Sequence, residues 1–199
     1  MKILKFDSEQ SWLEAREGKI TGTKVGGLFS KRDGTPLKGF YEIIAQHIAV
    51  PASGENVMDR GKRLEEEAVD RFVEETGKKV NKDLVLCVRD DNPNIAYSPD
   101  ALIGLTEDVE VKCLNSAAHI EAFLTKEIPS EYRPQIIQGF VVNPKLKTRY
   151  MVFYDNRMPK DFFYITVKRE EMKDEIETYL ALEQRALEQM AEIEMQLTF

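Results

Sequence analysis

Apolar residues recur at helical spacing along much of the chain, most clearly in one long segment. Its stripe consists of Leu64, Ala68, Val69, Phe72 and Val73. The stripe predicts a helix over Val57–Thr76, with Gly77 as a natural residue to end it. Weaker helical patterns predict further helices over residues 7–16, 21–29, 40–50, 117–126, 131–142 and 170–199.

In the middle of the chain the pattern changes to short apolar runs separated by turn residues. The extended segments predicted in this way are residues 84–88, 95–97, 109–114, 149–154 and 162–167. Helices that precede and follow such strands can cover both faces of a sheet. The pattern therefore predicts an α/β (α+β) fold with a central mixed sheet of about five strands flanked by helices.

The length of 199 residues is that of one domain. We expect a single domain over 1–199, with a helical N-terminal part (1–78), a chemistry-bearing sheet with its helices (79–168) and a C-terminal helix (169–199). No apolar run reaches about 18 residues, so no membrane span is expected. The first residues are too charged for a signal peptide, and two cysteines suit a reducing cytoplasm.

Charge is distributed unevenly along the chain. The net charge of −7 at first argues against a nucleic-acid partner. Residues 170–199, however, hold nine of the 35 acidic residues and two of the 28 basic ones, so residues 1–169 carry 26 of each. The prediction is an acidic C-terminal helix attached to a neutral body, which leaves room for local basic pockets.

The most informative stretch is Ser98-Pro99-Asp100, followed ten residues after the aspartate by Glu110-Val111-Lys112. On a strand, Glu110 and Lys112 project from the same face. The intervening turn places Asp100 roughly opposite Glu110, about 5 Å away across the two strands. Two carboxylates this close repel each other unless a cation lies between them.

Hard oxygen ligands without a His or Cys cluster favour magnesium or manganese. Lys112 beside such an ion can hold the attacking water of a hydrolysis, because a bound cation lowers the lysine pKa. A structural interpretation stays open: Pro-Asp is a common turn, and Glu-x-Lys on a half-exposed strand is often a weak surface ion pair.

Pro-Asp…Glu-x-Lys resembles the signature of the PD-(D/E)XK nuclease superfamily. Further blocks in the same order resemble one branch, the phage lambda-type exonucleases or YqaJ-like viral recombinases. These blocks are residues 11–23 (SWLEAREGKITGT), 61–65 (GKRLE), 132–138 (YRPQIIQ) and 153–158 (FYDNRM). Several ordered blocks are more specific than the core motif alone.

The resemblance implies a role for each matching position of the catalytic centre. Asp100, Glu110 and the carbonyl of Val111 would hold the catalytic Mg²⁺, with Lys112 at the water. Glu65 would complete the site for a second ion, and Mn²⁺ could substitute. Taken alone, Glu65 lies in a run of three glutamates, which is typical of a solvated helix face.

Gln135 matches the glutamine of the family's active site and would orient water or phosphate. Its other interpretation is a polar residue on a helix face. Arg16, Thr23 and Ser98 match the positions with which the family grips a 5′-terminal phosphate, as a guanidinium and hydroxyl donors can.

Met58 falls where the family carries an apolar wedge that separates the terminal base pair, although a methionine also fills gaps in a core. Arg32 lies in an exposed basic loop with Lys31 and Lys38. This loop could contact the duplex backbone, or its charges could simply keep it soluble.

The resemblance implies a Mg²⁺-dependent 5′→3′ exonuclease that processively degrades one strand of linear double-stranded DNA with 5′-phosphate ends. It would release 5′-mononucleotides and leave a 3′ overhang for recombination by strand annealing. The family also implies a homotrimer, a phage single-strand annealing protein as partner, and a phage or prophage gene expressed in the bacterial cytoplasm. Two alternatives stay open: an endonuclease on the same core, and a catalytically silent DNA-binding module.

Overall fold

The structure is a computed structural model, and it describes residues 8, 14, 30, 32, 35–49, 57–83, 85–92 and 95–197. Within these ranges, the side chains of residues 47, 57–62, 190–194, 196 and 197 are not described. The helices expected over residues 7–16 and 21–29 lie outside the described residues, apart from single positions. No helix in the described part of the chain is both long and apolar enough to cross a membrane.

The centre of the molecule is a mixed four-stranded sheet with the order β3-β4-β5-β6. Its strands are β3 (Ala101–Ile103), β4 (Glu107–Lys112), β5 (Thr148–Tyr154) and β6 (Phe162–Lys168). β4 and β5 are parallel, whereas β3 and β6 pair antiparallel at the two edges. The crossover between the parallel strands is long enough to carry two helices, as a parallel pair requires.

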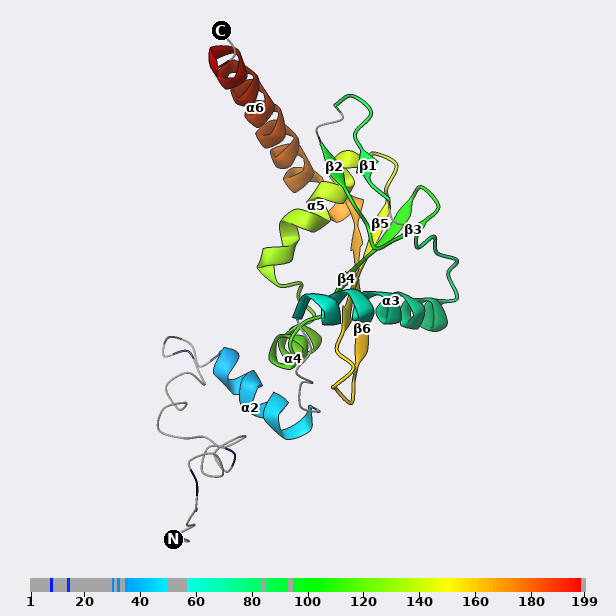
Figure 1. The fold of residues 1–199 in the computed structure, drawn as a ribbon, viewed down its shortest axis with the longest axis vertical. Coiled ribbons are helices and arrows are strands. Elements are labelled where there is room, and N and C mark those ends of the chain that lie inside the picture. Colours follow the sequence, from blue (N-terminus) through cyan, green and yellow to red (C-terminus); the bar gives the residue numbers. More distant parts are fainter. Residues whose placement is uncertain are drawn as a thin grey trace.

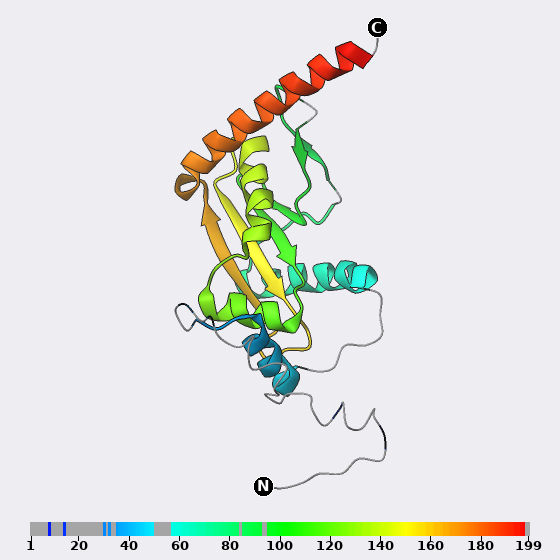
Figure 2. The same cartoon turned by 90° about the vertical axis from the view of Figure 1, so that its left-hand side faces the viewer.

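Helices cover both faces of this sheet, as Figures 1 and 2 show. The described helices are α2 (Lys38–Ile48), α3 (Val57–Thr76), α4 (Ser116–Thr125), α5 (Arg133–Val142) and α6 (Lys173–Leu197), with short 3₁₀ turns η2 (Ser130–Tyr132) and η3 (Arg169–Glu171). α5 lies along one face, α3 crosses the other, and α4 packs against α2. The far end of α6 extends away from the sheet.

Strand alternation decides which side chains meet which helix. Val109 and Val111 of β4 are buried against the stripe of α3 that includes Leu64 and Phe72. Residues one position out of phase, such as Glu110, therefore point to the face covered by α5. The core on that face contains Phe140 of α5, Met151 and Phe153 of β5, and Ile176 of α6.

The expected fold class is confirmed, with differences in detail. The long helix has the predicted bounds, and Gly77 follows it with a positive φ of 67°. The main sheet has four strands, because β1 (Cys87–Val88) and β2 (Ala96–Tyr97) form a separate two-stranded sheet. The single-domain expectation over 1–199, with its three parts, stays a prediction.

Candidate active site

The hairpin β3–β4 sets the position of Asp100 relative to Glu110. Ala101 pairs with Val109, and the backbone N–H of Asp100 donates to the Val109 carbonyl at 3.0 Å. Asp100 comes one residue before Ala101, so its backbone lies beside Val109 of β4, which precedes Glu110 in the chain. The hairpin therefore brings the Pro-Asp and Glu-x-Lys parts of the motif close together, and their role as a metal site stays a prediction.

The Asp100 carboxylate lies at the edge of β4, just where β3 begins. Its Oδ2 accepts the backbone N–H of Val111 at 2.6 Å. The N–H and the C=O of one strand residue point to the same edge, so the Val111 carbonyl also faces the Asp100 side of β4. Backbone and side-chain oxygens are therefore close together at this edge.

Glu110 is 9% exposed, and its carboxylate lies between two cationic side chains. Lys112 Nζ donates to its Oε1 at 2.7 Å, and Arg149 Nη2 donates to its Oε2 at 3.4 Å. Lys112 also lies over the ring of Tyr132, with Nζ 5.3 Å from the ring centroid. These contacts fix both members of the Glu-x-Lys pair on the α5 face of the sheet.

The electrostatic environment of Asp100 is unfavourable to its ionised form. Burial, together with the nearby charges of Glu110 and Glu65, raises the pKa of Asp100 to about 6, although the Val111 amide and Lys112 oppose this shift. Carboxylates this close to one another are expected where a cation binds, because a bound cation relieves their mutual repulsion.

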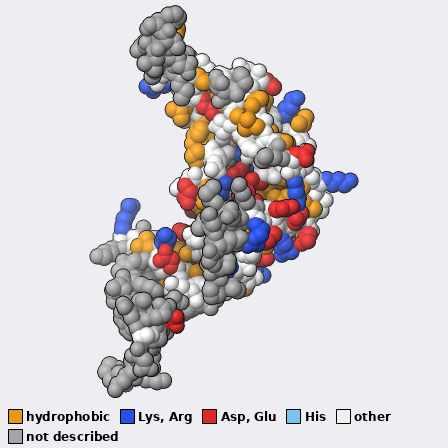
Figure 3. All heavy atoms as spheres, viewed as in Figure 1, with side chains coloured by type: hydrophobic (Ala, Val, Ile, Leu, Met, Phe, Trp, Pro, Cys, Tyr) orange, Lys and Arg blue, Asp and Glu red, His pale blue; other side chains and the backbone are white. Residues whose placement is uncertain are grey.

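Two cavities meet at Ser98 and contain most of the predicted site residues. One, of about 450 Å³, is lined by Ser98, Glu110, Lys112 and Gln135 among others. The second, of about 380 Å³, is lined by Glu65, Ser98 and Asp100 among others. In the view of Figure 3, acidic and basic side chains are mixed over the middle of the molecule.

The two cavities approach the site from opposite faces of the sheet. Glu65 is half-buried on α3, which covers the face of Val109 and Val111. Gln135 is exposed in the first turn of α5, on the face of Glu110 and Lys112. Asp100 lines the cavity on the α3 side together with Glu65, and it lies close to the β4 strand that bears Glu110 and Lys112 on the α5 side.

Of the residues predicted to bind the 5′-phosphate or DNA, the structure describes the side chains of two. Ser98 is exposed, and its Oγ donates to the Val85 carbonyl at 2.5 Å. Arg32 is exposed, and its backbone N–H donates to Ser30 Oγ at 3.3 Å. Arg16 and Thr23 lie outside the described residues. The backbone of Met58 belongs to α3, but its side chain also lies outside them.

The donor set at the sheet edge fits a hard divalent cation. Asp100, Glu110 and the Val111 carbonyl offer oxygen atoms of the kind that Mg²⁺ and Mn²⁺ prefer. Among the described residues, no three His, Cys, Asp or Glu side chains already converge as a metal cluster. The Glu110 oxygens contact the side chains of Lys112 and Arg149, and Asp100 accepts the Val111 amide.

Sequence reasoning missed several residues that line or support the site. Lys82 lines the cavity of Glu65, and Gln138 and Tyr179 line the cavity of Lys112. Arg149, which contacts Glu110, was assigned only to a strand. The sequence does contain a sign of this role. Arg149 and Met151 are two residues apart on β5 and therefore point to the same face, so strand alternation predicts that the Arg149 side chain is buried like that of Met151.

Known proteins share this architecture. The model of the YqaJ-like viral recombinase domain matches residues 11–143. An alkaline exonuclease from Laribacter hongkongensis (LHK-Exo) has a similar crystal structure, with a TM-score of 0.56 and 27% sequence identity over 95% of this chain and 100% of that chain. The crystal structure of LHK-Exo in complex with dAMP matches with the same values.

A phage-related exonuclease from Haemophilus somnus 129PT gives a TM-score of 0.46 and 16% identity over 94% of this chain and 90% of that chain. No curated protein sequence matches the chain.

Fold, motif and structural likeness define the class of protein as a hydrolase of the exonuclease type, built on the mixed α/β core that the sequence predicts. Within that class, the chain belongs to the YqaJ-like viral recombinase domain family. The family resemblance inferred from the sequence blocks is therefore confirmed.

Proposed function

We propose that this protein is a Mg²⁺-dependent exonuclease that degrades the 5′-ended strand of linear double-stranded DNA. The observation that supports the proposal is that Glu110 and Lys112 line one cavity with Gln135, that Asp100 lines a second cavity with Glu65, and that both cavities are lined by Ser98. Membership of a viral recombinase family and likeness to an alkaline exonuclease support it.

Asp100, Glu110 and the Val111 carbonyl would hold one divalent ion, and Glu65 would help hold a second. Such ions supply charge stabilisation at the phosphate and a water of lowered pKa. Lys112 would hold the attacking water through Nζ, which in the structure donates to Glu110 Oε1. Gln135, exposed in the first turn of α5, would orient that water or a phosphate oxygen through its amide.

The expected preference for a 5′-phosphate rests on Ser98, Arg16 and Thr23. Ser98 lines both cavities, so its hydroxyl can contact a phosphate group next to Asp100. Arg16 and Thr23 would complete the phosphate pocket, and Met58 and Arg32 would contact the duplex, as the family resemblance implies. Release of 5′-mononucleotides would leave a 3′ overhang.

A homotrimer that encloses DNA would make the enzyme processive, and a phage single-strand annealing protein would bind the overhang. These two partners belong to the proposal through the family alone. The bacterial cytoplasm is the compartment in which a phage or prophage enzyme of this kind would act.

The test uses purified protein with Mg²⁺ and three DNA substrates: linear with 5′-phosphate, linear with 5′-hydroxyl, and closed circular. We expect rapid digestion of the phosphorylated linear duplex, slower attack on the hydroxyl end and an intact circle. Cutting of the circle would instead identify an endonuclease. No cleavage and no Mg²⁺ binding by calorimetry would identify a silent DNA-binding module.

Two variants test the site itself. Asp100→Asn and Lys112→Met should each lower the cleavage rate by at least about a hundredfold, because each removes a group that acts on the reacting phosphate or water. Lys145→Met, which removes an exposed lysine in the turn before β5, is the matched control and should cleave normally. Wild-type rates in either site variant would contradict the assignment.

A further inference from the structure

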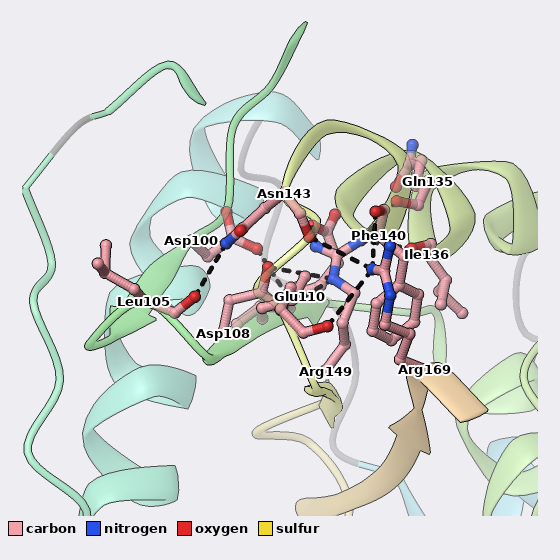
Figure 4. Close-up of polar contacts among 12 residues, drawn as sticks. Asp100, Leu105, Asp108, Glu110, Gln135, Ile136, Phe140, Asn143, Arg149 and Arg169 are labelled. Carbon is pink, nitrogen blue, oxygen red and sulfur yellow. Dashed lines mark hydrogen bonds and ion pairs between the residues drawn. The ribbon is translucent and has the colours of Figure 1, made fainter. Parts of the chain in front are cut away.

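The side chain of Arg149 is a buried cation directly behind the proposed active site. It rises from β5 and is 0% exposed. Figure 4 shows its guanidinium between Asp108 and Glu110 of β4 on one side and the backbone of α5 on the other. A charge in this position must be fully paired and hydrogen-bonded, because an unpaired buried charge is strongly unfavourable.

The pairing begins within the sheet. Asp108 and Arg149 are register partners on the parallel strands β4 and β5. Arg149 Nε donates to both Asp108 carboxylate oxygens, at 2.8 and 3.1 Å, and Nη2 donates to Glu110 Oε2 at 3.4 Å. One guanidinium thus binds a buried structural carboxylate and the carboxylate of the proposed metal ligand.

The remaining donor reaches the helix. Arg149 Nη1 donates to the carbonyls of Gln135 and Ile136, at 2.6 and 2.9 Å. This approach depends on Gly139, one turn further along α5: a Cβ there would lie 2.4 Å from Arg149 Nη1 and 2.5 Å from Cζ. The glycine therefore leaves the space in which the guanidinium lies against the helix backbone.

These contacts connect the two sides of the cavity of about 450 Å³ that Glu110, Lys112 and Gln135 line. Glu110 lies on the sheet side, and Gln135 lies on the helix side. We propose that Arg149 is a positioning residue of the nuclease: it fixes the Glu110 carboxylate for divalent-cation binding and holds the first turn of α5, with Gln135, at a set distance from it. This inference rests on the proposed function.

A second arginine provides a matched control. Arg169 Nη1 donates to the carbonyls of Phe140, Asn143 and Leu146 at 2.8, 3.3 and 3.4 Å, so it fastens the other end of α5. Within the described residues, the hydrogen bonds and ion pairs of Glu110 are with Lys112 and Arg149, whereas Arg169 lines a different cavity. Loss of either arginine should weaken the attachment of α5 to the sheet, but only the loss of Arg149 should also disturb Glu110.

The experiment compares Arg149→Lys with Arg169→Lys. Lysine keeps the charge but cannot reproduce the several directed donors of a guanidinium. We expect Arg149→Lys to weaken Mg²⁺ binding, measured by calorimetry without DNA, and to lower kcat, each by about tenfold or more, as is usual when the group behind a metal ligand is lost. The KM for DNA should change little.

Arg169→Lys should lower the melting temperature but leave Mg²⁺ binding and kcat unchanged. Gly139→Ala is the second variant, because it displaces the guanidinium without altering any charge; it should weaken Mg²⁺ binding and kcat as Arg149→Lys does, and it is decisive if Arg149→Lys does not fold.

Wild-type Mg²⁺ binding and kcat in folded Arg149→Lys or Gly139→Ala would overturn the positioning role. Equal losses in Arg149→Lys and Arg169→Lys would also overturn it, since they would indicate a general effect of loosening α5. A wild-type protein that neither cleaves DNA nor binds Mg²⁺ would instead refute the proposed function, so the two failures are distinguishable.

Discussion

At the scale of single residues, the candidate site lowers the free energy of unfolding. Asp100 is partly buried beside two other carboxylates, and its ionised form is disfavoured in the folded protein. A protein keeps such a group where function needs it, because a neutral side chain of the same shape would fold more easily. The free-energy cost should therefore be measurable as a pH-dependent stability.

The first prediction concerns Asp100→Asn in metal-free buffer. The folded-state pKa of about 6 lies above the ordinary value of 3.8, so the folded state binds more protons between these pH values. Stability from this group is therefore present at low pH and lost as pH rises through 6. Asparagine should be more stable than aspartate at pH 8 by about 2–3 kcal/mol, from about 1.4 kcal/mol per pKa unit.

Urea denaturation at several pH values, with a chelator present, checks this prediction. The difference between the two proteins should shrink towards pH 4, where Asp100 is protonated. Added Mg²⁺ should stabilise the wild type and not the variant. A stability difference that stays constant from pH 4 to pH 8 would show that the Asp100 carboxylate is not under this electrostatic pressure.

At the scale of elements, one buried carboxylate fastens the turn after β5 to the start of α4. Asp155 is 0% exposed, and Ser116 Oγ donates to its Oδ2 at 2.6 Å. Arg157 donates to the same carboxylate from Nε at 2.8 Å and from Nη2 at 2.9 Å. Because α4 follows directly after the Glu-x-Lys strand, this contact helps fix the exit of the strand that bears the site.

The second prediction is that Asp155→Asn destabilises the fold by about 2–3 kcal/mol at pH 7, the scale of hydrogen bonds to a charged group. Burial alone raises the pKa of Asp155, but the Arg157 and Ser116 hydrogen bonds outweigh it and lower the pKa below its ordinary value. This stabilisation is present above the ordinary pKa and is lost as pH falls through the lower folded-state pKa.

Denaturant unfolding of Asp155→Asn and Asp161→Asn checks it. Asp161 belongs to the same turn but pairs with Arg71 at 3.8 Å near the surface, where an ion pair contributes at most about 1 kcal/mol. We expect a large loss for Asp155→Asn and a small one for Asp161→Asn. Equal effects would mean that the turn is sensitive to any lost charge and that Asp155 has no special role.

Sequence periodicity predicted the elements that are long and strongly patterned. The helix Val57–Thr76 is an example, because five apolar positions repeat on one face. The strand Ala101–Ile103 is absent from the predicted strands, since three residues carry no alternation that could reveal pairing. The predicted extended segments 84–88 and 95–97 contain β1 and β2, but the pairing of these two-residue strands into a separate sheet depends on tertiary contacts that no local pattern contains.

The candidate site was predictable where spacing alone determines geometry. A hairpin with a short turn brings Asp100 next to the Val109–Val111 stretch of β4, and strand alternation places Lys112 on the same face as Glu110. Nothing local indicates that Gly139 and Arg149 fit together, because one lies on a helix and the other on a strand brought together only by folding. Long-range fit of this kind is the part that the sequence could not predict.

At the scale of the whole molecule, charge is distributed unevenly along the chain. Residues 170–199, which include α6 (Lys173–Leu197), carry nine acidic and two basic residues, whereas residues 1–169 carry 26 of each. The far end of α6 points away from the sheet. A neutral body offers DNA little net attraction, and an acidic helix repels it. An enzyme of this kind must hold DNA by another means if it digests many nucleotides in one encounter, and the proposed trimer that encloses DNA is such a means.

The last prediction separates enclosure from electrostatic binding. The enzyme is first loaded on linear duplex without Mg²⁺, and Mg²⁺ is then added with excess heparin, so that only loaded molecules act. We expect the loaded fraction to fall between about 50 and 200 mM salt, since each phosphate contact is salt-sensitive. The length digested by each loaded molecule should hardly change, because an enclosed duplex cannot leave sideways.

If charge alone holds the DNA, the digested length must fall together with the loaded fraction, since dissociation during digestion accelerates with salt. Sedimentation of the free protein in the same buffers is the control, because a trimer that dissociates at higher salt would lose processivity for a different reason. A monomer with a strongly salt-dependent digested length would refute enclosure while leaving Asp100, Glu110 and Lys112 as the proposed hydrolytic site.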